Sequence, residues 1–274
     1  MKTLSLFVIL LSITNLAYAL SSYYPAEFKE KMSEVRDEEL KQEIFRVLDM
    51  KHVGGKKEDI LVSSCNNAAS RCYSQRVLGY TAARKVLFGK LHLNQTEQGS
   101  YYVKDVYCQE QFRHGVGPDR IPNHTEINCE HTWPQSKFTG RFPNEMQKSD
   151  LHHLYPTDSR ANSIRGNNEF GEVDNEVSDL CATSAAGGDV SNGSGFYFEP
   201  PASHKGNVAR ALFYFSVRYQ IPISHRQEKT LREWHVIDPV DAEEEYRNDQ
   251  IHYIQGNRNP FIDLPELADR ISDF

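Results

Sequence analysis

The apolar positions of this chain recur with helical spacing in several stretches. Within residues 23–50, Leu40, Ile44, Val47 and Leu48 recur at separations of three and four positions and are flanked by Glu and Lys. This is the pattern of an amphipathic helix. Similar patterns predict further helices over residues 80–91, 205–220 and 231–255, the last interrupted near Pro239.

Strand-like patterns are shorter and fewer. Residues 101–109 are rich in Tyr and Val with partial alternation, and residues 126–130 form a short second candidate. A helix that opens after Pro156, with Asp158 and Ser159 as candidate N-caps, is predicted over residues 156–165. The Gly-rich residues 183–195 predict a surface loop. The predicted fold class is α+β: a mixed, helix-rich single domain with a small antiparallel sheet.

The N-terminus has the pattern of a secretory signal peptide, residues 1–19. A positive residue precedes an apolar stretch at residues 4–13, and a small-x-small cleavage site ends at Ala19. The apolar stretch is too short to span a bilayer, although a buried N-terminal helix is an alternative. We therefore expect a secreted or periplasmic protein cleaved after Ala19. The remaining residues 20–274 would form one domain that opens with a helical extension over residues 20–60.

Composition excludes several classes of protein. The 14 Phe and 14 Tyr can build a core and the net charge of -7 is moderate for 274 residues, which excludes intrinsic disorder. No apolar run beyond the N-terminus is long enough for a polytopic membrane protein, so we expect no stable membrane association. The acidic balance excludes a protein that coats nucleic acid by bulk charge. Part of the acidic excess lies in residues 238–249.

The five cysteines leave their pairing open. Their number is odd, so at least one thiol is unpaired unless it bonds to another chain. Cys65 and Cys72 are close enough in sequence to pair, and Cys108 and Cys129 could face each other across a hairpin, but the sequence does not choose among these pairings. No CxxC motif occurs, which argues against a zinc ribbon or a thioredoxin-like site.

One segment, residues 129–168, concentrates side chains suited to catalysis. A strand-like stretch ends in Glu130 and His131, and a predicted helix carries Asn162. An imidazole at a strand end can activate a water molecule. Mg²⁺ is commonly held by one or two protein oxygens together with waters and substrate phosphate, so Glu130 and Asn162 would suffice as ligands. Spacing alone leaves a purely structural interpretation open.

Four separated blocks carry a resemblance to a known family. They are Cys129–Ser136, Ser149–Pro156 followed by Asn162, Phe198–Tyr219 and Gln255–Phe261. In this order they resemble the bacterial endonuclease I family, secreted or periplasmic nucleases of the ββα-metal (His-Me finger) superfamily. The resemblance runs from about Tyr73 to Asp263, most of the predicted mature chain.

The resemblance implies a mixed fold built around a two-strand-plus-helix metal motif. His131 matches the general base, while Glu130 and Asn162 match the ligands of one divalent cation, Mg²⁺ or another such as Mn²⁺ or Ca²⁺. The family also places an arginine near the cleaved phosphate, for which Arg141 and Arg165 are the candidates here. Some members are closed by several disulfides, and this chain has too few cysteines for that pattern.

Two further assignments remain open. Asp150, His152 and His153 either orient His131 or a metal-bound water, or form structural hydrogen bonds at a turn. For Trp133, packing in the core is favoured over stacking on a nucleobase.

The implied substrate is nucleic acid gripped by its phosphate backbone, DNA with RNA as an alternative, and we expect a monomer. A backbone grip gives weak sequence preference. Five positive residues lie near the proposed centre: Lys137, Arg141, Lys148, Arg160 and Arg165. The competing hypotheses are a secreted ribonuclease with the same site, a catalytically silent binding module and, with little support, a zinc hydrolase.

Overall fold

The computed structural model describes residues 22–65, 71–176, 180–189 and 193–274. The predicted signal peptide lies outside the described residues. Helices and four small sheets make up the structure, which confirms the α+β class. Within the described residues, no helix combines the length and apolarity needed to cross a bilayer.

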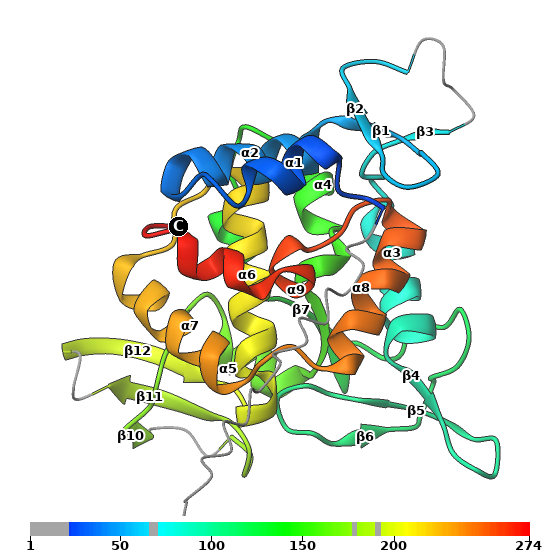
Figure 1. Cartoon of the computed structure of the whole chain (residues 1–274). Coiled ribbons are helices and arrows are strands. Elements are labelled where there is room, and N and C mark those ends of the chain that lie inside the picture. The colour runs from blue at the N-terminus through cyan, green and yellow to red at the C-terminus, as the bar shows by residue number, and fades with distance from the viewer. Residues whose placement is uncertain (1–21, 66–70, 177–179, 190–192) are drawn as a thin grey trace, which may run out of the picture.

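In the view of Figure 1, most of the helices lie in the upper part of the molecule and most of the strands lie in the lower part. The α-helices are α1 (Ala26–Lys31), α2 (Asp37–Asp49), α3 (Tyr80–Val86), α4 (Asn144–Lys148), α5 (Ser159–Arg165), α6 (Lys205–Tyr219), α7 (His225–Ile237), α8 (Ala242–Gln255) and α9 (Pro260–Asp263). A π-helical segment, Leu87–Leu91, continues α3, and 3-10 turns include Leu151–His153 and Pro265–Arg270.

The strands form short sheets with mostly antiparallel pairing. They are β1 (Lys51–Val53), β2 (Ile60–Val62), β3 (Cys72–Tyr73), β4 (Leu93–Gln95), β5 (Tyr101–Lys104), β6 (Gln111–Phe112), β7 (Ile127–His131), β8 (Leu154–Asp158), β9 (Glu169–Phe170), β10 (Asn175–Glu176), β11 (Ala185–Asp189) and β12 (Gly193–Glu199). The sheet orders are β2-β1-β3, β4-β5-β6, β7-β8 and β10-β11-β12-β9, with β12 and β9 parallel.

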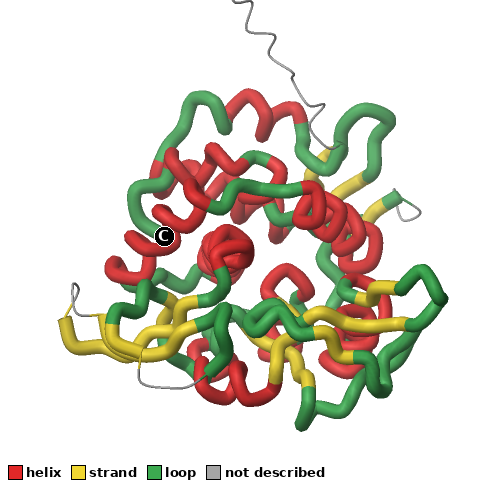
Figure 2. The backbone as a smooth tube through the Cα atoms, turned by 90° about the horizontal axis from the view of Figure 1, so that it is seen from below, coloured by secondary structure: helices red, strands yellow, loops and turns green. Residues whose placement is uncertain are grey.

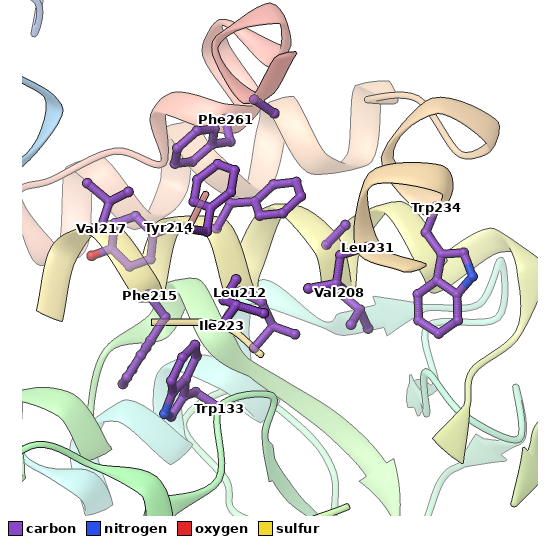
Figure 3. Close-up of a cluster of buried hydrophobic side chains, with 14 of the residues drawn as sticks. Trp133, Val208, Leu212, Tyr214, Phe215, Val217, Ile223, Leu231, Trp234 and Phe261 are labelled. Carbon is purple, nitrogen blue, oxygen red and sulfur yellow. The ribbon is translucent and has the colours of Figure 1, made fainter. Parts of the chain in front are cut away.

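Helix α6 is the centre of the larger hydrophobic core. Every one of its residues except Asn207 is buried, and α7, α2 and α9 pack around it (Figures 1 and 2). Its apolar side chains meet Trp133 from below and Phe261 from above (Figure 3). A helix that is apolar on most sides is stable only when neighbours cover it all round, so the predicted, mostly buried helix over residues 205–220 is confirmed.

The β7-β8 pair connects this core to a smaller one. Ile127, Cys129 and Leu154 pack with Leu87 and Phe88 from the α3 side. Residues Ile127 to His131 pair in register with Asp158 to Leu154. The predicted strand over residues 126–130 is therefore confirmed within one residue.

Three local predictions are wrong, each for a traceable reason. The strand expected over residues 101–109 ends at Lys104, because the Asp105 carboxylate accepts hydrogen bonds from the backbone N–H groups of Tyr107, Cys108 and Glu110 and forms a turn. The helix expected from Pro156 begins at Ser159, since Pro156 pairs with Cys129 in the sheet. The cap prediction holds, as the Asp158 carboxylate accepts from the N–H of Ala161.

The predicted loop over residues 183–195 contains β11 and the start of β12. Glycine is needed here for close packing of two strands and not for a loop. A Cβ atom on Gly187 would lie 2.1 Å from the carbonyl oxygen of Asn175, so only glycine lets β10 approach β11 this closely.

Of the two candidate disulfides that the sequence left open, the structure forms one. Cys65 bonds to Cys72. Cys108 bonds to Cys181, 73 positions away, and Cys129 is a buried free thiol. Cys108 cannot face Cys129 across a hairpin because β7 pairs with β8 and the turn that carries Cys108 follows β5.

The acidic run over residues 238–249 is only partly a solvated helix face. Within α8, Glu244 is buried and forms an ion pair with Arg210 of α6, whose Nε lies 2.9 Å from Oε1. Arg210 also donates to the carbonyl oxygen of Asp238. The ion pair therefore attaches α8 to the central helix.

We predict that Arg210→Met lowers the free energy of unfolding by about 3–5 kcal/mol, because it leaves the Glu244 carboxylate buried without a counter-charge. The double variant Arg210→Met/Glu244→Leu should recover much of this loss, since it removes both charges. Urea unfolding followed by circular dichroism measures both. Equal destabilisation of the single and double variants would contradict the assignment.

Candidate active site

Two strands and a helix build the candidate site. The antiparallel pair β7-β8 leads directly into α5, which packs against both strands. Glu130 and His131 are the last two residues of β7, and Asn162 lies in the middle of α5. All three line one open pocket of about 460 Å³. The structure thus brings the three residues predicted to act together to a shared surface.

His131 is held as a neutral imidazole with a defined tautomer. Its Nε2 lies 3.1 Å from the carbonyl oxygen of Lys148, and Nδ1 lies 3.3 Å from the side-chain nitrogen of Gln135. A carbonyl oxygen can only accept, so Nε2 carries the proton and Nδ1 has the lone pair. Burial, reinforced by His153, lowers the pKa of His131 well below its usual value. The ring can therefore accept a proton at neutral pH.

Glu130 is almost fully buried and forms an ion pair with an arginine. Arg165 Nη1 lies 3.0 Å from Oε1 of Glu130, and the Tyr107 hydroxyl donates to the same oxygen at 2.9 Å. Burial raises the pKa of Glu130, while Arg165 and Tyr107 act in the opposite direction. The backbone N–H of His131 also hydrogen-bonds to this carboxylate. Both side-chain partners bond to Oε1, so in the described part of the chain no side chain is recorded on the other oxygen, where a cation could bind.

Asn162 offers a second oxygen. Its Nδ2 donates to Oδ1 of Asn128 at 2.6 Å, which fixes the orientation of the amide group. Its own Oδ1 then remains available as an acceptor, and Asn162 lines the pocket.

The donor set fits a hard cation. One carboxylate and one amide oxygen line the pocket, and oxygen ligands completed by water and phosphate are typical of Mg²⁺. Among the described residues, no three His, Cys, Asp or Glu side chains converge as a metal site. Cys129 also lines the pocket, but its side chain packs in the smaller core, and burial raises the pKa of the thiol to about 12, which disfavours the thiolate that binds soft metals.

The two candidate arginines have different positions. Arg165 lines the pocket, but its guanidinium is buried and also donates to the carbonyl oxygens of His131 and Thr132. Arg141 lies on an exposed loop and lines a different cavity, next to Glu38 and Phe274. The structure therefore does not bring Arg141 to the pocket, because the segment after Trp133 turns toward α2 and the C-terminus.

The hydrogen bonds of Asp150 and His152 lead away from His131. Asp150 accepts from the hydroxyls of Tyr214 and Tyr219 and from the side chain of Gln255. Nε2 of His152 lies 3.2 Å from the carbonyl oxygen of Asn257. These contacts support the structural alternative, in which both residues join the turn before β8 to α6 and the C-terminal segment.

His153 and Trp133 pack rather than face the pocket. The rings of His153 and His131 are 5.4 Å apart, and His153 bonds to the carbonyl oxygen of Gln147. Trp133 stacks on Phe215 with centroids 5.1 Å apart. The stack on Phe215 supports core packing of Trp133, and another part of the indole lines a separate cavity.

Sequence reasoning missed several residues that shape the site. Gln135 lies inside the Cys129–Ser136 block and could have been singled out there. Tyr80 packs against the His131 ring, with centroids 5.4 Å apart, and Tyr107 bonds to Glu130. Tyr80 and Tyr107 are more than 20 positions from the motif, and no spacing signal links them to it.

A strand pair and a helix that present an imidazole, a carboxylate and an amide to one open pocket are consistent with the ββα-metal (His-Me finger) superfamily. The chain belongs to the endonuclease I family, whose profile, described as Endonuclease I, matches residues 66–266.

Individual relatives are similar over part of their length. An extracellular ribonuclease of Bacillus subtilis is 37% identical over 163 residues, 53% of each chain. An endonuclease-1 of Buchnera aphidicola from Acyrthosiphon pisum is 32% identical over 118 residues, 42% of this chain and 44% of the relative. An extracellular deoxyribonuclease of Aeromonas hydrophila is 29% identical over 121 residues, 44% of this chain and 50% of the relative. The chain thus spans about half the length of the curated relatives it matches.

The buried imidazoles predict a loss of stability in acid. Burial lowers the pKa of His152 and of His153 from 6.5 to about 4. Below pH 6.5 the unfolded chain therefore binds protons that the folded chain does not, and the free energy of unfolding falls as the pH drops from 6.5 to 4.

We predict that His153→Gln reduces this slope by up to about 1.4 kcal/mol per pH unit. His114→Gln, at an exposed position, should leave the slope unchanged. Chemical unfolding at several pH values provides the measurement. A slope equal to that of the unmodified protein would show that His153 titrates normally in the folded state.

Proposed function

We propose that this protein is a secreted, metal-dependent endonuclease that hydrolyses phosphodiester bonds with little sequence preference. Residues 20–274 would form its catalytic domain and would act as a monomer. The observation that carries the proposal is the neutral, oriented imidazole of His131 beside the oxygens of Glu130 and Asn162 in one open pocket. Membership of the endonuclease I family supports it.

His131 would act as the general base. Its Nδ1 takes a proton from a water molecule in line with the phosphorus, while the carbonyl of Lys148 holds Nε2–H. The same carbonyl favours the imidazolium that results, because it accepts a stronger hydrogen bond from a charged donor. Gln135, next to Nδ1, would help to place the water.

Glu130 and Asn162 would hold the cation, Mg²⁺ or an ion such as Mn²⁺ or Ca²⁺. When bound, such an ion supplies positive charge to the phosphate and to the leaving oxygen. Arg165 would act as a positioning residue that keeps Glu130 ionised and in place, since its guanidinium is already occupied by Glu130 and three carbonyl oxygens. This differs from the expected contact between an arginine and the phosphate.

The substrate would be DNA, with RNA as the alternative. Relatives named as ribonucleases and relatives named as deoxyribonucleases both match the chain, so matched digests of DNA and RNA are the direct test. Exposed Lys137 and half-buried Lys148 lie close to the pocket. They would bind the phosphate backbone of the nucleic acid, so nuclease activity should fall as the salt concentration rises.

Secretion is supported by three observations. Residues 1–19 have the signal-peptide pattern, two disulfides suit an oxidising compartment, and several relatives are named extracellular or periplasmic nucleases. Cleavage after Ala19 can be checked by sequencing the N-terminus of the exported protein.

We predict that His131→Ala lowers plasmid cleavage by at least about a hundredfold, the usual contribution of a general base. Its thermal unfolding and its affinity for Mn²⁺ should stay close to those of the unmodified protein. His114→Ala serves as the control, because His114 is exposed and should keep full activity. Undiminished cleavage by His131→Ala would refute the assignment of the base.

We predict that Asn162→Leu weakens cation binding at least about tenfold, while Asn162→Asp retains it, because a carboxylate keeps an oxygen ligand at this position. Mn²⁺ binding followed by electron paramagnetic resonance measures the affinity directly, without cleavage. The same affinity in both variants would mean that Asn162 is not a ligand.

A further inference from the structure

A second cavity adjoins the proposed reaction centre. It has a volume of about 270 Å³, close to the lower end of the range for small-molecule sites. Pro134 and Arg165 line both this cavity and the pocket of His131. The two spaces therefore share a wall, so a group bound in the second cavity would lie next to a phosphate held at His131.

The inner wall of this cavity is rigid and apolar. Trp133 contributes an aromatic surface, and Leu212 and Ile223 lie above it (Figure 3). Trp133 is immobilised by stacking on Phe215 at an interplanar angle of 16° and by a hydrogen bond from Nε1 to the carbonyl oxygen of Lys137. A preformed flat apolar wall suits a planar ring, because little ordering is needed on binding.

The rim of the cavity has polar groups that can still donate or accept a hydrogen bond. Nδ2 of Asn168 donates to the carbonyl oxygens of Ile164 and Arg165, so its Oδ1 remains an acceptor. Gln227 lines the cavity, and in the described part of the chain no hydrogen bond is recorded for its side-chain amide. Lys137, exposed at the same rim, supplies a positive charge. An apolar slot with amide groups and a cation at its edge matches a nucleobase that is attached to a phosphate.

We propose that this cavity receives one nucleobase of the substrate strand, next to the phosphate that is cleaved. The proposal rests on the proposed nuclease function and deepens it. A base that is paired and stacked in a duplex cannot enter the cavity without leaving the helix. The site therefore favours single-stranded nucleic acid, and stacking makes it tolerant of base identity.

The substrate test uses single-stranded oligonucleotides with one cleavable phosphodiester among methylphosphonate linkages. One abasic residue is placed at successive positions around that bond. Removal of the seated base should lower kcat/KM about tenfold, as expected for one lost stack, and removal of distant bases should have little effect. Equal cleavage of the intact and of all the abasic oligonucleotides would overturn the proposal. If no oligonucleotide or plasmid were cleaved at all, the proposed nuclease function itself would fail.

The protein test fills the cavity. Gln227→Trp should slow cleavage of the intact oligonucleotide about tenfold and abolish the abasic effect, because the indole takes the place of the base. Glu233→Trp is the matched control, on the same helix but exposed and outside the cavity. Intact sensitivity to the abasic residue in Gln227→Trp would contradict the proposal.

A binding measurement on the unmodified protein covers the case in which Gln227→Trp does not fold. The chain has two tryptophans, and Trp234 is fully buried outside the cavity. Adenosine 5′-monophosphate should therefore quench the fluorescence of Trp133, whereas ribose 5-phosphate, which lacks the base, should not. Equal quenching by both, or by neither, would overturn the proposal.

Discussion

A buried ion pair between Glu130 and Arg165 joins the end of β7 to the last turn of α5. Both side chains are almost fully shielded from water, so either charge without the other would cost several kcal/mol. Arg165 also binds the carbonyl oxygens of His131 and Thr132, which sets the course of the chain immediately after the imidazole. Such a pair adds little net stability. Its effect is to fix one relative position of strand and helix, and that position brings Asn162 to the same pocket as His131.

A second buried charge, the Asp150 carboxylate, connects the strand pair β7-β8 to the helices that pack behind it. Asp150 lies in the turn before β8 and accepts hydrogen bonds from Tyr214 and Tyr219 of α6 and from Gln255 at the end of α8. Burial opposes its ionisation, but the neighbouring imidazoles and these donors lower its pKa overall. The family-like segments around residues 149–156, 205–219 and 255–261 thus meet at one carboxylate. None of these three segments lines the pocket, which is formed by residues around His131 and by α5 with Asn162.

The acidic net charge of the chain does not describe the candidate site. Within the acidic stretch, Glu244 points inward and forms a buried ion pair with Arg210. The surroundings of the pocket carry Lys137 and Lys148, and a bound divalent cation would add positive charge that the sequence count omits. Local placement of charge, rather than the total of -7, decides whether a phosphate backbone can approach.

Local sequence signals determined the features that depend on near neighbours. They include the helix over residues 205–220 and the strand that ends in His131, because apolar spacing acts within a few positions. Only the tertiary structure decided the contacts between distant segments. The bond from Cys108 to Cys181, the pairing of Arg165 with Glu130, the remote position of Arg141 and the cavity beside Trp133 all depend on how β7, α5 and α6 pack. The free energy of such contacts comes from burial and charge compensation across the core, which a one-dimensional pattern does not record.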